Sequence, residues 1–309
     1  MKIFVAGATG AIGRPLVRQL VAAGHQVTGM TRTAGKAAGL LEQGAEVVVI
    51  NALDTETMKE AVRQAKPEIV IDQLTDLPKK ANPFRFRSFY KKQTPLKETA
   101  PLPLLEAAIE VRAERHIMQS VAFMYAPAGQ LRSEDDPVYL DAPPPWDTAI
   151  PPFPRIEQRI VDEAALEGIV LRYGFFYGPG THMAPGASLY RDVQRRRYPI
   201  VGDGGGIYSF VHVDDAAAAT VLAAEAGQGG IYNVVDDTPL AVREWLPAYA
   251  SAIGAKPPRR VSRWLARIAV GAIPTHFSTT LDGASNLKAR RALSWTPGRP
   301  DAREGFGKE

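Results

Sequence analysis

The chain has 309 residues, of which 45% are hydrophobic and 23% charged, a composition typical of a soluble globular protein with a sizeable core. It contains no cysteine, which excludes disulfides, thiolate metal sites and a cysteine nucleophile. The net charge of +4 includes basic clusters at 195–197 and 259–260, but no stacking series of aromatic residues accompanies them. We therefore expect no nucleic-acid partner.

The first half of the chain alternates short apolar runs with amphipathic helical stretches. Strands are predicted at 2–6, 26–30, 46–50, 68–72 and 116–120, and helices at 11–23, 34–43, 55–64 and 102–111. Strand–helix alternation at this spacing requires parallel pairing, because each helix must carry the chain back across the sheet. The sequence therefore predicts an α/β fold with a doubly wound parallel sheet of the Rossmann type.

The second half is less regular, and its proline-rich and acidic stretch at 126–154 is predicted to be a surface loop. Further elements are a helix at 155–166, a strand at 169–173, a glycine-rich turn at 202–206, a strand at 208–211, a helix at 214–225 and a strand at 231–235. We expect residues 1–173, with about 207–235, to form the dinucleotide-binding domain. Residues 174–206 and 236–309 are expected to form a smaller C-terminal substrate lobe built from discontinuous segments.

Membrane and metal partners are not expected. No apolar run approaches the roughly 20 residues that span a bilayer, and no targeting segment precedes the first strand. We therefore expect a cytoplasmic protein. No group of histidines and carboxylates has metal-ligand spacing.

The first strand runs into a glycine turn that is typical of dinucleotide-binding proteins. Gly7, Gly10 and Gly13 follow the strand and open a helix, and the turn also contains Thr9, Ala11 and Ile12. Glycines are needed here because the chain turns sharply, the backbone approaches the pyrophosphate, and the helix packs closely on the strand. The N–H groups at the start of the helix favour phosphate binding.

The end of the second strand indicates which dinucleotide binds. A carboxylate there would bind the ribose hydroxyls of NAD, but this strand is followed by Thr31 and Arg32. A guanidinium group can bind the 2′-phosphate of NADP, and Arg14 and Lys36 lie nearby in the sequence. We therefore predict NADP(H) over NAD(H).

Ligands of this fold lie at the carboxyl ends of the strands, so the residues that follow strands three and four are further cofactor candidates. Those after strand three, beside the adenine, are Asn51, Ala52 and Leu53. Those after strand four, along the path to the nicotinamide, are Gln73, Leu74 and Thr75. Ser120, at the end of strand five, lies nearest the expected nicotinamide position.

These motifs resemble the short-chain dehydrogenase/reductase superfamily, specifically its extended branch, the NAD-dependent epimerase/dehydratase family. The segments that carry the likeness are the glycine turn and residues 170–180, 208–215, 285–288 and 293–297. The resemblance implies cofactor contacts from Tyr173, Gly174, Phe175 and Phe176. It also implies a homodimer formed through two helices.

The sequence departs from the family at its catalytic pair. Family members carry Tyr-x-x-x-Lys on the helix before the strand at 169–173; the tyrosine exchanges a proton, and the lysine lowers its pKa and holds the nicotinamide ribose. Here the matching segment, 146–158, has neither residue, and no Tyr-x-x-x-Lys occurs in the chain. The family's catalytic hydroxyl falls on Val121, with Ser120 one residue earlier and so on the other face of the strand.

Three residues are therefore candidates for catalysis. Ser120 lies near the nicotinamide, Glu157 lies on the helix where the missing pair would stand, and His182 follows the turn that begins the substrate lobe. The alternatives are a structural hydroxyl, a solvated carboxylate and a solvated histidine. The residues predicted to contact the substrate are Phe123, Tyr177, His182 and Tyr208.

The leading interpretation is an NADP-dependent oxidoreductase that acts on a small organic carbonyl or alcohol with a non-standard proton donor. One alternative is a non-redox epimerase, dehydratase, lyase or cyclase of the same fold, which the missing pair favours. Another is a regulatory protein that senses the dinucleotide, against which a full substrate lobe argues. Fold alone does not decide between them.

Overall fold

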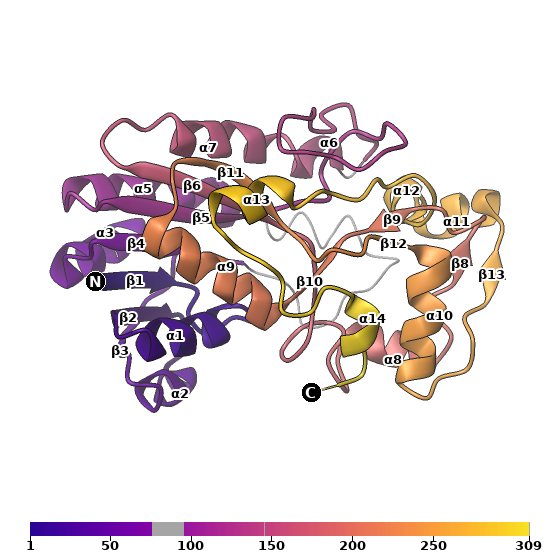
Figure 1. Ribbon diagram of the computed structural model, residues 1–309, viewed down its shortest axis with the longest axis horizontal. Helices are drawn as coiled ribbons and strands as arrows, with labels where there is room; N and C mark the ends of the chain where they lie inside the picture. The colour runs from indigo at the N-terminus through magenta and orange to yellow at the C-terminus, as the bar shows by residue number, and fades with distance from the viewer. Residues whose placement is uncertain (76–95, 145, 309) are drawn as a thin grey trace.

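A computed structural model describes residues 1–75, 96–144 and 146–308, and its centre is a parallel sheet (Figure 1). In the described residues the sheet has seven strands, in the order β11 (Gly230–Val234), β6 (Glu167–Tyr173), β5 (Arg115–Val121), β4 (Ile69–Asp72), β1 (Lys2–Ala6), β2 (Gln26–Thr31) and β3 (Glu46–Val49). Every neighbouring pair is parallel. The predicted doubly wound Rossmann fold is confirmed.

The helices cover both faces of this sheet and build the lobe beyond it. Those around the sheet are α1 (Gly13–Ala22), α2 (Ala38–Leu41), α3 (Thr55–Ala65), α5 (Pro101–Glu110), α7 (Pro152–Val161), α9 (Val213–Ala226) and α13 (Leu287–Ala292). Those of the lobe and its approaches are α6 (Trp146–Ala149), α8 (Ser188–Gln194), α10 (Val242–Ala252), α11 (Arg263–Val270), α12 (Ala272–Thr279) and α14 (Ala302–Gly305).

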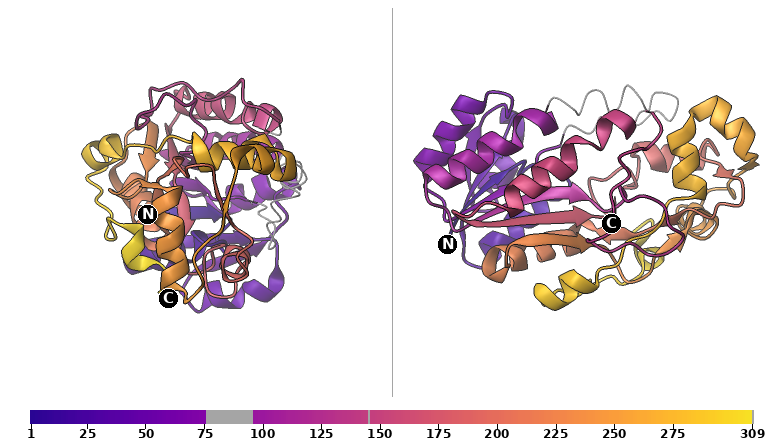
Figure 2. Two further views of the ribbon diagram at one scale, coloured as in Figure 1. Left: turned by 90° about the vertical axis from the view of Figure 1, so that its right-hand side faces the viewer. Right: turned by 90° about the horizontal axis from the view of Figure 1, so that it is seen from above.

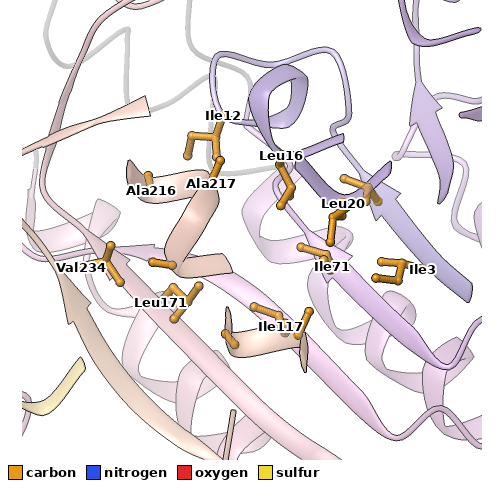
Figure 3. Packing of buried hydrophobic residues seen from close by; sticks show 14 of the residues in the cluster. Ile3, Ile12, Leu16, Leu20, Ile71, Ile117, Leu171, Ala216, Ala217 and Val234 are labelled. Atoms are coloured by element: carbon orange, nitrogen blue, oxygen red, sulfur yellow. The ribbon is translucent and has the colours of Figure 1, made fainter. Parts of the chain in front are cut away.

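The alternation of side chains along β1 explains the two layers. Ile3 and Val5 are buried on one face, against residues such as Leu16 of α1 and Ala217 of α9 (Figure 3). Phe4 and its neighbours on the other face pack against α3, α5 and α7. Because the sheet is covered on both sides, its strands are apolar at nearly every position.

The segments expected to form the substrate lobe lie at the end of the molecule away from the N-terminus (Figure 2). Short strand pairs join its segments: β7 (Phe175–Tyr177) with β10 (Phe210–His212), β9 (Ile207–Tyr208) with β12 (Leu240–Ala241), and β8 (Ile200–Val201) with β13 (Arg260–Val261). An aromatic cluster fills it. The C-terminal segment then returns to the sheet, where Leu293 and Trp295 are buried with α1 and α9.

The helix expected at 34–43 is interrupted in the structure. It consists of a 3-10 turn, η1 (Ala34–Lys36), followed by the short α2. Gly35 and Gly39 lower helix propensity in this segment, which explains the break. None of the helices in the described ranges is both long and apolar enough to cross a membrane.

Candidate functional site

The glycine turn between β1 and α1 leaves no room for a side chain at Gly7 or Gly13. Gly7 has a φ of +86°, and a Cβ atom there would lie 2.4 Å from the backbone oxygen of Gln73. A Cβ atom on Gly13 would lie 2.3 Å from the oxygen of Gly7. The backbone can therefore come close to a pyrophosphate, and α1 begins with no acidic residue in its first turn. This geometry fits a dinucleotide, which would be held by the turn and the start of α1.

The other cofactor candidates lie along the same edge of the sheet. Thr31, at the end of β2, contacts Thr9 of the glycine turn through hydroxyl groups 3.0 Å apart. Arg32 follows and is exposed. After β3, the Oδ1 atom of Asn51 accepts a hydrogen bond from the backbone N–H of Leu53 at 3.2 Å. Contacts of these residues with a cofactor stay predictions.

Next to the glycine turn, the residues after β4 connect to β5 and β6. The amide of Gln73 donates to the Tyr173 hydroxyl at 3.2 Å, and the amide of Gln119 donates to the oxygen of Leu74 at 3.4 Å. Burial raises the pKa of Tyr173 to about 12, so its hydroxyl stays protonated. Thr75 is exposed beside them. Gln73 and Leu74, at the end of β4, are thus tied by hydrogen bonds to β6 and β5.

The turn that begins the substrate lobe lies against the glycine turn. A Cβ atom on Gly180 would be 3.6 Å from the Cα atom of Ala11. His182 follows, with its Nδ1 atom 2.8 Å from the Ser188 hydroxyl. Burial lowers the pKa of His182, so the imidazole is neutral at neutral pH. His182 therefore stands near the cofactor turn and is already engaged by Ser188.

Aromatic rings form a stack between the sheet and the lobe. Phe175 lies between Phe123 and Tyr208, with ring centroids 4.5 Å and 4.2 Å away. Trp146 and Phe277 meet edge to face at 4.7 Å on the same cluster. Sequence reasoning found Phe123 and Tyr208 but missed Trp146 and Phe277, because the first lies in the proline-rich segment expected to be a loop.

The remaining rings predicted for the site point elsewhere. Phe176 lies 5.3 Å from Tyr173, on the side of the sheet that carries α1 and α9. Tyr177 is buried against His212 at 5.0 Å and Phe306 at 5.8 Å. Phe175 was predicted as a cofactor contact, but its ring joins the predicted substrate residues. The sequence alone could not assign these alternating side chains to their faces.

Ser120 lies on the face of the sheet that α7 covers. It pairs in register with Arg172 of β6, whereas Val121 pairs with Tyr173. Ser120 is buried, and its hydroxyl has no hydrogen-bond partner among the described residues. An unpaired buried hydroxyl at the end of a central strand is available to a ligand.

Glu157, the candidate on α7, is committed to a buried ion pair. Its carboxylate oxygens lie 3.2 Å and 2.5 Å from two nitrogens of Arg172. Arg172 also donates to the Tyr125 hydroxyl at 2.8 Å, which in turn donates to Asn233 at 2.7 Å. Burial raises the pKa of Tyr125 to about 12. The one titratable candidate on α7 is therefore closed in a hydrogen-bonded network with Arg172 and Tyr125.

Sequence reasoning missed two charged residues, Asp72 and Lys97. Asp72 ends β4, is 1% exposed, and accepts the backbone N–H of Leu74 at 2.8 Å. Burial raises the pKa of Asp72, and the nearby ammonium group of Lys97 opposes that shift. The sequence signal that could have indicated Asp72 is its place as the last residue of an otherwise apolar strand.

The sequence model of the NAD dependent epimerase/dehydratase family matches residues 3–234 of this chain. The chain belongs to this family. It is 41% identical, over the whole of both chains, to a 3-diazoavenalumate denitrifying reductase from a Streptomyces species. It is 26% identical, over 83% of this chain and 74% of the relative, to a 4-hydroxy-2-methyl-3-oxo-4-farnesyl-3,4-dihydroquinoline-1-oxide ketoreductase from Stigmatella aurantiaca.

Solved structures agree on the fold. A UDP-glucose 4-epimerase from Thermotoga maritima, with UDP-glucose, superposes with a TM-score of 0.77 at 21% identity, covering 99% of this chain and 96% of the other. A UDP-glucose 4-epimerase from Thermus thermophilus, in complex with NAD, gives 0.75 at 24% identity, covering 99% and 97%. Membership of this family, together with the relatives named as reductases, identifies this chain as an NAD(P)-dependent enzyme of the oxidoreductase or epimerase type.

Proposed function

We propose that this protein is an NADPH-dependent reductase that replaces the diazo group of an aromatic substrate with hydrogen. The observation that carries the proposal concerns α7, the helix on which the family has its proton-exchanging tyrosine and lysine. Here Glu157 of this helix is closed in a buried ion pair with Arg172 of β6. The 41% identity with a denitrifying reductase over both full lengths supports it. A reaction that consumes no proton would need no such tyrosine.

Reduction of an arenediazonium ion has this property. The bound reduced dinucleotide supplies a hydride, which forms a new C–H bond as the C–N bond breaks and N₂ leaves with the electrons of that bond. The positive charge of the substrate ends on the oxidised nicotinamide, so no proton is taken up or released. The protein then has to orient the ring and exclude water rather than deliver a proton.

The aromatic stack supports a flat substrate. Phe123, Phe175 and Tyr208 lie parallel within 27°, and Trp146 extends the cluster toward α7. Such rings offer planar surfaces that bind another aromatic ring by offset stacking. Phe123 and Phe175 are only partly buried, so the exposed parts of these rings can contact a ligand beside the end of β5.

Three cations support the preference for NADP. Arg32 is exposed at the end of β2, where a carboxylate would favour NAD, and Lys36 lies one short turn further on. Arg14 is exposed in the first turn of α1. A 2′-phosphate at the end of β2 would gain charge-assisted hydrogen bonds from this group.

The test is to mix the purified protein with NADPH and 3-diazoavenalumate and to follow NADPH consumption and N₂ release. The proposal predicts equal amounts of both. The Gly13→Ala variant, whose cofactor turn is blocked, serves as the control for spontaneous reduction. Consumption no faster than with this variant would contradict the proposal, and turnover without dinucleotide oxidation would indicate a non-redox enzyme.

A second candidate is carbonyl reduction, which the ketoreductase relative favours. This reaction consumes a proton, and the unpaired Ser120 hydroxyl at the end of β5 is the polar group that could orient a carbonyl there. A parallel assay with aromatic ketones separates the two. Ketone-dependent NADPH consumption with an inert diazo substrate would favour this candidate.

A further inference from the structure

Lys97 lies between the cofactor edge of the sheet and the aromatic stack. It precedes α5, is half-buried, and its Nζ atom lies 5.7 Å from the centre of the Phe153 ring. Phe153 stands at the start of α7 and packs against the aromatic cluster of the lobe. One side of the ammonium group therefore faces the aromatic region proposed to bind the substrate, at a distance typical of cation–π contact.

The charge of the Asp72 carboxylate also acts on this ammonium group. One of its carboxylate oxygens accepts the Leu74 N–H, and the other has no hydrogen-bond partner among the described residues although the side chain is 99% buried. A buried carboxylate requires a cation nearby. Lys97 is close enough for its charge to act on Asp72, and Asp72 acts on Lys97 in turn. Asp72 thus supplies the negative charge that favours an ammonium group at Lys97.

Among the described residues, two other basic side chains around the site are not available for an anion. Arg172 is held by Glu157 and Tyr125. His276, 6.1 Å from Trp146, is kept neutral because burial lowers its pKa to about 4. An ammonium group has three donors, so Lys97 can lie within the field of Asp72 and still donate toward a ligand.

On the basis of the proposed function, we infer that Lys97 binds the carboxylate of a flat aromatic acid, with Asp72 holding the ammonium group in place. In this proposal the aromatic stack binds the ring of the acid, and the Lys97 ammonium group binds its carboxylate. An ammonium–carboxylate hydrogen bond in a partly desolvated site is strong and selective for the anion. The substrate class is therefore an aromatic carboxylic acid rather than its neutral ester.

The inference is tested by binding, without turnover. Protein loaded with NADP⁺ is titrated calorimetrically with 4-hydroxycinnamate and with its methyl ester. We expect Lys97→Met to weaken binding of the acid by about tenfold or more, to leave the ester unchanged, and to leave NADP⁺ affinity unchanged. Lys97→Arg should keep most of the affinity because it keeps the charge. The matched control is Lys288→Met, since Lys288 of α13 makes the same kind of contact, 5.4 Å from the centre of the Tyr232 ring of β11.

Thermal melting verifies that each variant is folded, and Lys97→Gln replaces the methionine variant if that one is not. Equal affinity of wild type and Lys97→Met for the acid would overturn the inference, as would equal losses for acid and ester. Wild-type protein that does not prefer the acid would also overturn it. Charge-dependent binding of the acid by a protein that leaves 3-diazoavenalumate unchanged would instead refute the proposed function and leave the role of Lys97 intact.

Discussion

The carboxylate of Glu157 contacts Arg172 through two oxygens, at 3.2 Å and 2.5 Å, and both side chains are at most 4% exposed. The pair joins α7, the helix on which the family's tyrosine and lysine are expected, to β6. Its position makes Glu157 a structural residue of the site rather than a proton donor, because both of its carboxylate oxygens accept hydrogen bonds from Arg172.

Glu157→Gln should therefore reduce stability far more than it changes chemistry. Leaving Arg172 buried without its counter-charge is expected to lower the free energy of unfolding by about 3–5 kcal/mol. Urea denaturation measures this loss. Glu163→Gln is the control, since Glu163 pairs with the half-exposed Arg159 at 2.7 Å and should cost about 1 kcal/mol or less. A stable Glu157→Gln protein without activity would contradict the structural role.

The glycine turn makes a prediction about cofactor binding. Gly13→Ala would put a methyl group 2.3 Å from the Gly7 oxygen, so the turn and the start of α1 must shift. We expect NADPH affinity to fall by about tenfold or more. Fluorescence titration measures it, with Gly35→Ala as the control, because a Cβ atom there meets nothing within 4 Å. Unchanged affinity in Gly13→Ala would rule out this turn as the pyrophosphate site.

Arg32 makes a prediction about cofactor choice. Arg32→Glu should weaken NADPH binding by about tenfold or more, while NADH binding should stay the same or improve, because a carboxylate can bind ribose hydroxyls. The exposed Arg291 on α13 provides the control variant Arg291→Glu. If both dinucleotides lose affinity equally, or neither does, the assignment of Arg32 to the 2′-phosphate is wrong.

Asp236 makes a prediction about pH. Burial raises its pKa to about 8, well above the value near 4 in the unfolded chain. Between these values the folded state holds a proton that the unfolded state has lost, so the free energy of unfolding falls as pH rises toward about 8 and then levels off.

Between about pH 6 and about pH 9, ionisation of Asp236 should lower the free energy of unfolding by up to about 2–3 kcal/mol. The Asp236→Asn variant should lack this pH dependence. Urea denaturation of both proteins at the two pH values measures it. The histidines titrate in both proteins, so their contribution cancels in the comparison. Parallel pH dependences in wild type and variant would show that Asp236 is ionised at neutral pH.

The fold was predictable because its signals are local. The glycine turn after β1 and the alternation of apolar strands with helices fix a doubly wound sheet, and the absence of an acid after β2 follows directly from the sequence. The missing tyrosine–lysine pair was also visible, since it depends on one short segment.

The site was less predictable because its contacts are distant in the chain. Nothing in the sequence pairs Asp72 with Lys97, or Glu157 with Arg172, since such contacts arise only when helices pack on strands. Trp146 was assigned to a loop because proline surrounds it, yet it is 1% exposed in the aromatic cluster. Local pattern predicts an element, whereas the face a side chain takes depends on tertiary packing.

The most direct test of the proposed reaction follows the transferred hydrogen. The protein is given NADPH that carries deuterium at both C4 positions, with 3-diazoavenalumate in ordinary water, and the product is examined by NMR and mass spectrometry. The account predicts one deuterium on the ring carbon that bore the diazo group for each N₂ released. Ordinary hydrogen at that carbon would contradict direct hydride transfer and, with it, the proposed function.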